Sequence, residues 1–118
     1  MGSSVSQALP QRIQTVPEML AWWNQQIPDA EALYHKDKGW WEPLTWREYQ
    51  ERSDSIAAGL ISIGITPGDH IAILSQTKLE WILADIAIMS CGAVTVPIYQ
   101  SNTAEQCEYI IGHSECSA

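Results

Sequence analysis

The chain has 118 residues, of which 46% are hydrophobic and 17% are charged, proportions typical of an ordinary soluble globular domain. Fourteen acidic residues outnumber six basic ones, and the net charge of −8 argues against nucleic acid and against anionic membrane surfaces as partners. Because Glu80 and Asp85 interrupt the longest apolar stretch, we expect no transmembrane segment, and because no signal peptide is recognisable, we expect a cytoplasmic protein.

The amino-terminal residues predict a loose tail followed by a short helix. Residues 1–14 are polar and lack a periodic pattern, which is typical of a flexible tail, so we expect the folded part to span residues 15–118. Pro17 is favoured at the start of a helix, and this helix is expected to run to about Gln26.

Two adjacent tryptophans on that helix are candidates for an interface. Neighbouring side chains on a helix are about 100° apart, so Trp22 and Trp23 cannot both face the same core. One of them is therefore expected to serve an interface. Alternatively, both belong to the flank and core of one wide apolar stripe.

The next segment predicts a β-hairpin that leads into a second helix. Residues 31–36 and 40–44 are aromatic-rich and flank a short loop that ends in Gly39. Thr45 and Glu48 then have the spacing of a capping box, which predicts a helix start.

The second helix is expected to end before Gly64, and a type II turn is expected at residues 66–69. Its apolar positions share one predicted inner face: Tyr49, Ile56, Ala57, Leu60 and Ile61.

The most apolar part of the chain predicts a parallel βαβ unit with a right-handed crossover. Residues 70–74 show no polar alternation, as expected for a strand covered on both faces. Nine of the twelve residues in 79–90 are apolar, so this helix is expected to be buried on more than one side. Thr77 and Glu80 predict its capping box, and residues 93–98 are the next expected strand.

A third capped helix is expected to begin at Thr103, with Gln106 completing its cap and Cys107, Ile110 and Ile111 facing inward. The sequence stops where another strand should begin, so we expect an amino-terminal fragment of a larger protein. The predicted fold class is α/β: an incomplete parallel-sheet βαβα scaffold with an amino-terminal helix and a β-hairpin.

Candidate ligand contacts follow the two predicted parallel strands. Ligands of open α/β sheets bind beyond the carboxyl ends of the strands, which here means residues 75–77 and 99–102. Neither loop has the glycine-rich pattern that phosphate binding usually needs. Ser75, Thr77 and Thr103 are more simply loop and cap residues, and Lys78 is more simply a solvated side chain. Tyr99 is the residue to test first for a substrate-side contact.

The remaining titratable side chains predict no catalytic or metal site. The three histidines lie on different expected elements without a matched nucleophile: His35, His70 and His113. Cys91, Cys107 and Cys116 are expected to be small apolar fillers. A zinc site made by Cys107, His113 and Cys116 would have irregular spacing and would lack a fourth ligand.

From Leu44 to its end, the sequence resembles the amino-terminal region of AMP-forming acyl-CoA synthetases, especially the long-chain fatty acid ligases. The resemblance covers about two-thirds of the chain and depends on LTWREY at 44–49, GITPGDHIAIL at 64–74, EWILADIAIMSCGAVTVPIY at 80–99 and EQCEYIIGHSEC at 105–116. Residues 16–32 resemble the leading helix of that family.

The resemblance implies a two-step ligase that uses ATP, Mg and coenzyme A. A fatty acid would react with ATP to give an acyl-adenylate and pyrophosphate, and the thiol of coenzyme A would then displace AMP. The family's phosphate loop and catalytic residues have no counterpart here, so no catalytic, cofactor or metal residue is assigned to this chain. The segment would be scaffold for the remainder of the synthetase chain, and Trp22 and Trp23 would be candidates for a homodimer contact.

Two other functions are considered. A shortened gene product could act as a non-catalytic binding or regulatory module, docking onto a full-length synthetase through its unfinished sheet edge. An unrelated flavodoxin-like module is less well supported, because the sequence has neither an acidic pocket nor a phosphate loop.

An incomplete scaffold is expected to expose more apolar surface than a monomeric protein tolerates. At micromolar concentration, the chain should therefore bind a hydrophobic dye or self-associate. Dye fluorescence and analytical ultracentrifugation test this expectation. A monomer that binds no dye and melts sharply would contradict it.

Overall fold

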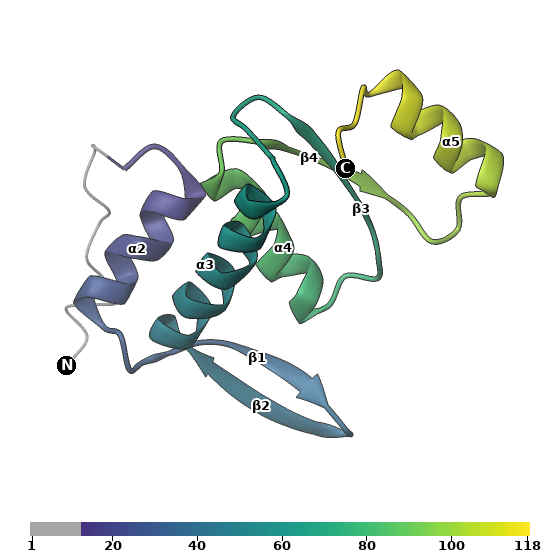
Figure 1. Ribbon diagram of the computed structural model, residues 1–118. Helices are drawn as coiled ribbons and strands as arrows, with labels where there is room; N and C mark the ends of the chain where they lie inside the picture. The colour runs from purple at the N-terminus through teal and green to yellow at the C-terminus, as the bar shows by residue number, and fades with distance from the viewer. Residues whose placement is uncertain (1–12) are drawn as a thin grey trace. The chain divides into compact units, whose positions relative to one another are not determined.

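The computed structural model describes residues 13–118, and its elements follow one another along the chain in Figure 1. They are α2 (Val16–Gln26), β1 (Glu31–Asp37), β2 (Trp40–Thr45), α3 (Trp46–Ser62), β3 (His70–Leu74), α4 (Leu79–Ser90), β4 (Val94–Ile98) and α5 (Ala104–His113). The boundary between two compact units falls within α3, between Arg52 and Ser53. The predicted tail of residues 1–14 lies, except for its last two residues, outside the described residues.

The first unit begins with the predicted helix, α2, which the structure shows to be capped at both ends. Thr15 is the N-cap of α2, and its Oγ1 accepts a hydrogen bond of 3.2 Å from the backbone N–H of Glu18. At the other end, the N–H of Ile27 donates to the carbonyl oxygen of Trp23. These contacts satisfy polar groups that every helix leaves unpaired at its ends, and the predicted helix is confirmed.

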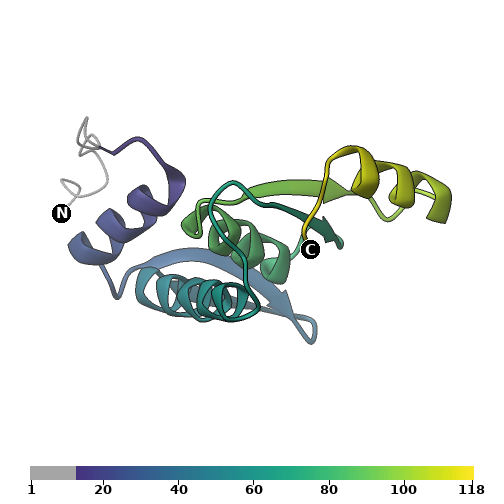
Figure 2. The same ribbon diagram turned by 45° about the horizontal axis from the view of Figure 1, so that its top comes forward.

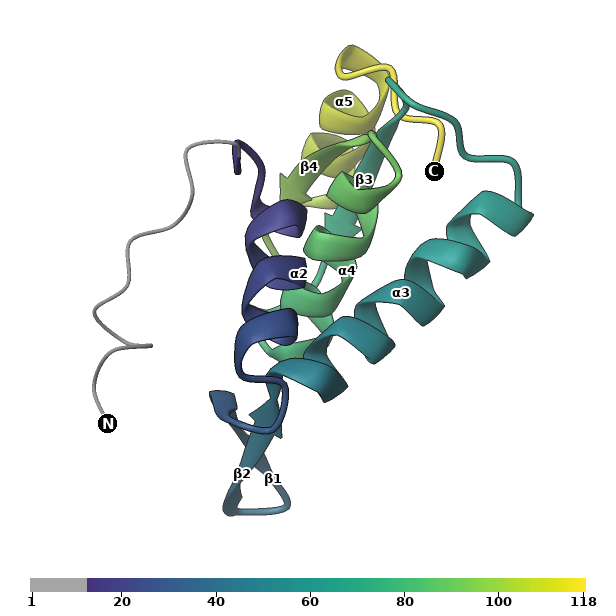
Figure 3. The same cartoon turned by 90° about the vertical axis from the view of Figure 1, so that its left-hand side faces the viewer.

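Strands β1 and β2 form the predicted antiparallel hairpin, seen at the bottom of Figure 3. The two residues of its turn both have positive φ, 51° at Lys38 and 87° at Gly39. Positive φ at both central residues is the geometry of a type I′ turn, whose twist matches that of the flanking strands. Pro43, opposite Tyr34, is tolerated because a two-stranded ribbon leaves an edge on each strand.

A complete capping box starts α3, as the sequence predicts. Thr45 Oγ1 accepts from the backbone N–H of Glu48 at 3.1 Å, and Glu48 Oε1 accepts from the backbone N–H of Thr45 at 3.0 Å. Arg47 Nη2 lies 3.0 Å from Asp29 Oδ1, in the turn that precedes the hairpin. Both of these charged side chains are exposed, so their ion pair contributes little stability.

A row of aromatic rings connects α2 with the start of α3. The Trp23 and Trp46 rings stack at 5.8 Å, and the Trp46 and Tyr49 rings at 6.2 Å. Trp22 meets Trp23 edge-on at 4.7 Å and is itself buried. Offset and edge-on ring pairs stabilise beyond their buried area, so the row fixes how α2 lies against the first turn of α3.

The second unit is built on the predicted βαβ arrangement. Strands β3 and β4 are parallel, and α4 lies along one face of their sheet, as Figure 2 shows. Ala87 on α4 is completely buried, as expected for a helix that is apolar on most sides. The core of this unit consists of Ala57, Ile65, Ile71, Ala87, Ile88, Cys91 and Ala93.

The last residues of the chain pair with the free edge of β3. His70 forms a parallel bridge with Cys116, and the N–H of Ser117 donates to the carbonyl oxygen of His70 at 2.7 Å. The N–H of Ala72 donates to the carbonyl oxygen of Ala118 at 2.9 Å. Residues 116–118 therefore lie along the edge of β3 opposite β4 as an isolated parallel bridge.

The predicted capping box of α4 is wrong. The helix begins at Leu79, and its N-cap is Lys78, whose side chain makes no capping hydrogen bond. Thr77 lies one residue before the N-cap, because the first intrahelical hydrogen bond runs from the N–H of Ile82 to the carbonyl oxygen of Lys78 at 3.1 Å. Glu80 Oε1 instead lies 3.9 Å from Lys78 Nζ.

Two predicted helix faces also need correction. On α3, Ile61 is exposed and Ser53 is buried instead, because eight residues place Ile61 about 80° from Ser53 around the helix. On α5, no residue is fully buried: Cys107 and Ile110 are half-buried, and Ile111 is exposed. The cap of α5 follows the prediction, since Thr103 and Gln106 form a complete capping box.

Gly92 offers a test of the packing between the 66–69 turn and the end of α4. Its φ is +75°, and a Cβ added there would lie 3.2 Å from Pro67 Cβ. The substitution Gly92→Ala should therefore lower the free energy of unfolding by about 1–2 kcal/mol, measured by urea unfolding followed by circular dichroism.

Gly112→Ala is the matched control, because Gly112 lies within α5 and has no neighbouring atom within 4 Å of an added Cβ. It should raise the same free energy by up to about 1 kcal/mol. Equal effects of the two substitutions would contradict the proposed packing constraint.

Candidate functional site

The two loops predicted to face a ligand lie at one edge of the parallel sheet. Leu74 and Ile98, the last residues of β3 and β4, are register partners, so the loops that follow them leave the sheet side by side. In open α/β sheets, this carboxyl edge is where ligands bind. The structure thus brings together the starts of residues 75–77 and 99–102 at this edge, as the sequence predicts.

The loop after β4 is held by its own hydrogen bonds. Asn102 Oδ1 accepts from the backbone N–H of Tyr99 at 3.0 Å, and the N–H of Asn102 donates to the carbonyl oxygen of Tyr99 at 3.0 Å. Asn102 Nδ2 also donates to Gln106 Oε1 at 3.3 Å. These bonds fix the loop and leave the exposed Tyr99 ring as its largest side chain accessible to a ligand.

The loop after β3 has one cation and little fixed structure. Ser75 Oγ donates to the carbonyl oxygen of Gln76 at 3.0 Å. Lys78 Nζ lies 3.9 Å from Glu80 Oε1, and both side chains are exposed. The single positive charge at this edge is therefore shared with a carboxylate, which weakens it as a phosphate ligand.

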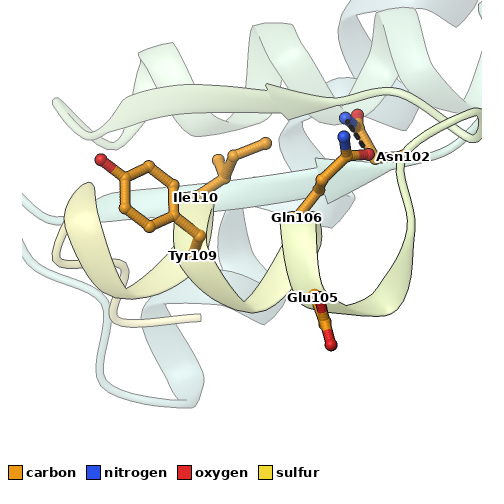
Figure 4. Close-up of a pocket in the computed structure, with 5 residues that line it drawn as sticks. All are labelled: Asn102, Glu105, Gln106, Tyr109 and Ile110. Carbon is orange, nitrogen blue, oxygen red and sulfur yellow. Dashed lines mark hydrogen bonds between the residues drawn. The ribbon is translucent and has the colours of Figure 1, made fainter.

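A shallow pocket of about 360 Å³ lies on α5 and the loop before it. It is lined by Asn102, Glu105, Gln106, Tyr109 and Ile110. Figure 4 shows the amides of Asn102 and Gln106 turned toward each other, whereas Glu105 leaves the helix on the other side. These five side chains include no cation, so the pocket suits an uncharged or apolar group better than a phosphate.

The three histidines lie on three different elements, β1, β3 and α5. His35 on β1 is the strand-register partner of Glu42 on β2, and His70 Nδ1 contacts the carbonyl oxygen of Ser114. The His113 ring stacks on Tyr109 at 5.3 Å. Each histidine has a structural neighbour, and the prediction that none of them acts as a general base stays a prediction.

The three cysteines are free thiols, and only Cys91 is fully buried. Its Sγ lies 3.6 Å from the carbonyl oxygen of Ala57, and burial raises the pKa of its thiol. Cys107 and Cys116 are half-buried. Among residues 13–118, no cluster of three His, Cys, Asp or Glu side chains is arranged to hold a metal ion.

Two carboxylates close turns and have lowered pKa values. The backbone N–H of Thr66 donates to Asp69 Oδ2 at 2.8 Å and lowers the pKa of Asp69, although partial desolvation opposes the effect. Smaller contributions come from the hydroxyls of Thr66 and Ser117 and from the charge of His70. In the capping box of α3, the backbone N–H of Thr45 likewise lowers the pKa of Glu48.

Two polar features were missed by sequence reasoning. Thr95 Oγ1 donates a hydrogen bond of 2.7 Å to Asp85 Oδ1, and this bond joins β4 to α4. Asp85 interrupts an apolar helix, and that interruption was the available signal. The Ser53 hydroxyl, in a side chain 1% exposed, finds no hydrogen-bond partner within the described part of the chain.

Residues 20–118 match the protein family described as AMP-binding enzyme. The chain is 43% identical over 88 residues to the long-chain-fatty-acid–CoA ligase FadD15 of Mycobacterium bovis, covering 75% of this chain and 15% of that protein. It is 34% identical over 119 residues to the long-chain-fatty-acid–CoA ligase heimdall of Drosophila melanogaster, covering 98% and 17%. The chain therefore spans about a sixth of the length of these relatives.

Solved structures confirm the α/β fold class. The fatty acyl-adenylate ligase of Legionella pneumophila, in complex with acyl adenylate and pyrophosphate, aligns with a TM-score of 0.82 at 23% identity, over 92% of this chain and 20% of that chain. The NpsA N-terminal subdomain of Klebsiella oxytoca aligns with a TM-score of 0.77 at 25% identity, over 88% and 26%. In residues 13–118, no helix has the length and hydrophobicity required to cross a bilayer.

Asp69 predicts a specific pH dependence of stability. Its pKa is lowered in the folded chain, so the stability it contributes is present above its ordinary pKa of 3.8 and is lost as the pH falls through the lower folded value. Asp69→Asn removes this contribution. Urea unfolding should therefore separate wild type from Asp69→Asn at about pH 6 and bring them closer together at about pH 3.

Glu108→Gln, on the exposed surface of α5, is the control, and its difference from wild type should be the same at both pH values. A difference between wild type and Asp69→Asn that persists unchanged at low pH would show that the Thr66–Asp69 contact does not depend on the ionised carboxylate.

Proposed function

The chain belongs to the AMP-binding enzyme family, and from this premise we propose that it is the amino-terminal scaffold segment of an ATP-dependent, AMP-forming long-chain fatty acid CoA ligase. The observation that carries the proposal is the match to long-chain-fatty-acid–CoA ligases, which extends over three-quarters of the chain or more. The likeness of its fold to a ligase that holds an acyl adenylate supports the same reaction class.

In the proposed reaction, a fatty acid carboxylate attacks the α-phosphorus of ATP, which forms an acyl-adenylate and releases pyrophosphate. The sulfur of coenzyme A then attacks the acyl carbon, AMP leaves and the thiol loses its proton. Mg²⁺ would offset the phosphate charge.

The described residues do not fit a binding site for ATP, Mg²⁺ or coenzyme A. The cation beside the first loop, Lys78, is paired with Glu80, and the loop after β4 uses its amides internally. The proposal therefore assigns binding of these groups, and the chemical steps, to the longer protein. Within this segment, only Tyr99 is proposed as a substrate-side contact.

What this segment contributes is a rigid edge. Burial of α4 and the pairing of β3 with β4 fix the position of two loops that the rest of the protein could complete into a site. We also propose a cytoplasmic location and a homodimer contact at Trp22 and Trp23. Of these two rings, the half-buried Trp23 is the more accessible to a second subunit.

The 118-residue chain is expected to be inactive alone, because it lacks a fitted nucleotide site. ATP–pyrophosphate exchange with palmitate should not exceed the protein-free blank. Exchange by the isolated chain would overturn the scaffold proposal.

A chimera tests the same proposal through an activity that should be retained. This segment, placed in the corresponding part of the FadD15 ligase of Mycobacterium bovis, should retain palmitate-dependent exchange. The same chimera carrying Ala87→Asp should lose it, because Ala87 is completely buried and cannot accommodate a charge. A folded chimera without exchange would contradict the proposed function.

A further inference from the structure

The end of the β1–β2 hairpin exposes an unusual concentration of aromatic side chains. Trp40 is 75% exposed, Trp41 68% and Tyr34 56%. Lys36 and Lys38, also exposed, lie among them. These five residues are called the aromatic tip below. Indole and phenol rings are large apolar bodies with one polar atom, and they are rarely left in water without a partner surface.

The strand register places an indole on each face of the aromatic tip. Lys36 is the register partner of Trp41, and Tyr34 lies two residues from Lys36, so these three side chains share one face. Trp40 precedes Trp41 and therefore points to the opposite face. The hairpin turn, with φ of 51° and 87°, holds the two strands closely together at this end (Figure 3).

This geometry fits a surrounding medium better than a flat partner. A folded protein that docks on one face of the hairpin would leave an indole on the other face in water. The interface of a lipid bilayer can surround the tip on both faces, and tryptophan and tyrosine are the residues enriched at that depth.

Charge selects the kind of bilayer. The chain has a net charge of −8, which opposes approach to an anionic surface, and within residues 36–42 of the hairpin the charges of Lys36 and Lys38 are balanced by those of Asp37 and Glu42. Lysine stems can lie along apolar surface while their ammonium groups reach lipid phosphates. Phosphates are also present in zwitterionic lipids, which do not repel the rest of the chain.

We propose that the aromatic tip of the β1–β2 hairpin inserts into the headgroup region of zwitterionic phospholipid bilayers. The inference depends on the hairpin alone and does not depend on the proposed ligase activity. Binding is peripheral: the tip enters the interface and does not cross the bilayer.

Sedimentation with phosphatidylcholine vesicles and quenching of tryptophan emission by brominated lipid test the proposal. The chain should bind, and Trp40→Ser with Trp41→Ser should lower the partition constant by on the order of tenfold or more. Trp40→Tyr with Trp41→Tyr should bind within about threefold of wild type, because tyrosine also favours the interface. Circular dichroism establishes that each variant is folded.

Ile63→Ser is the matched control, because Ile63 is 70% exposed but lies outside the hairpin, and its loss should not change binding. Vesicles with about one-third phosphatidylserine should give no tighter binding. The proposal is overturned if wild type fails to bind phosphatidylcholine, if the serine and tyrosine variants behave alike, if Ile63→Ser weakens binding as much as the double serine variant, or if binding requires phosphatidylserine.

Discussion

Burial of α4 against the β3–β4 sheet is the constraint on which the second compact unit depends. A helix apolar on most sides must be covered by other elements, and Ile71 on β3 and Ala57 on α3 belong to the same core as Ala87. The hydrogen bond from Thr95 to Asp85 adds a directional link between α4 and β4. Together these contacts hold the two strands in register, which is what brings their following loops to one edge.

Much of the fold is predictable because its local signals are strong. The capping boxes at Thr45 and Thr103 each satisfy donors at a helix start, and the structure contains both. The turn before β3 shows the Thr66–Asp69 hydrogen bond and a positive φ at Gly68. In each case, a few neighbouring residues decide the conformation, so sequence spacing is enough.

The errors arise where distant residues decide the outcome. Thr77 has the spacing of a cap, but α4 begins one residue later than that spacing predicts, at the buried Leu79. Ile111 is apolar, but nothing in the described chain covers it fully. For the candidate site, the sequence was enough to predict the carboxyl edge of the β3–β4 sheet and the two loops that follow these strands. The shallow pocket on α5 was not, because it is formed by side chains whose packing no local pattern specifies.

The turn of the hairpin has a consequence for the sequences that this position tolerates. Lys38 adopts a left-handed backbone, with φ of 51°, where a residue other than glycine costs about 1–2 kcal/mol and asparagine costs less. Natural variation governed by folding alone would drift toward asparagine or glycine at this position. A lysine that persists there would be retained for its ammonium group and four-carbon stem, despite the conformational strain of its left-handed backbone.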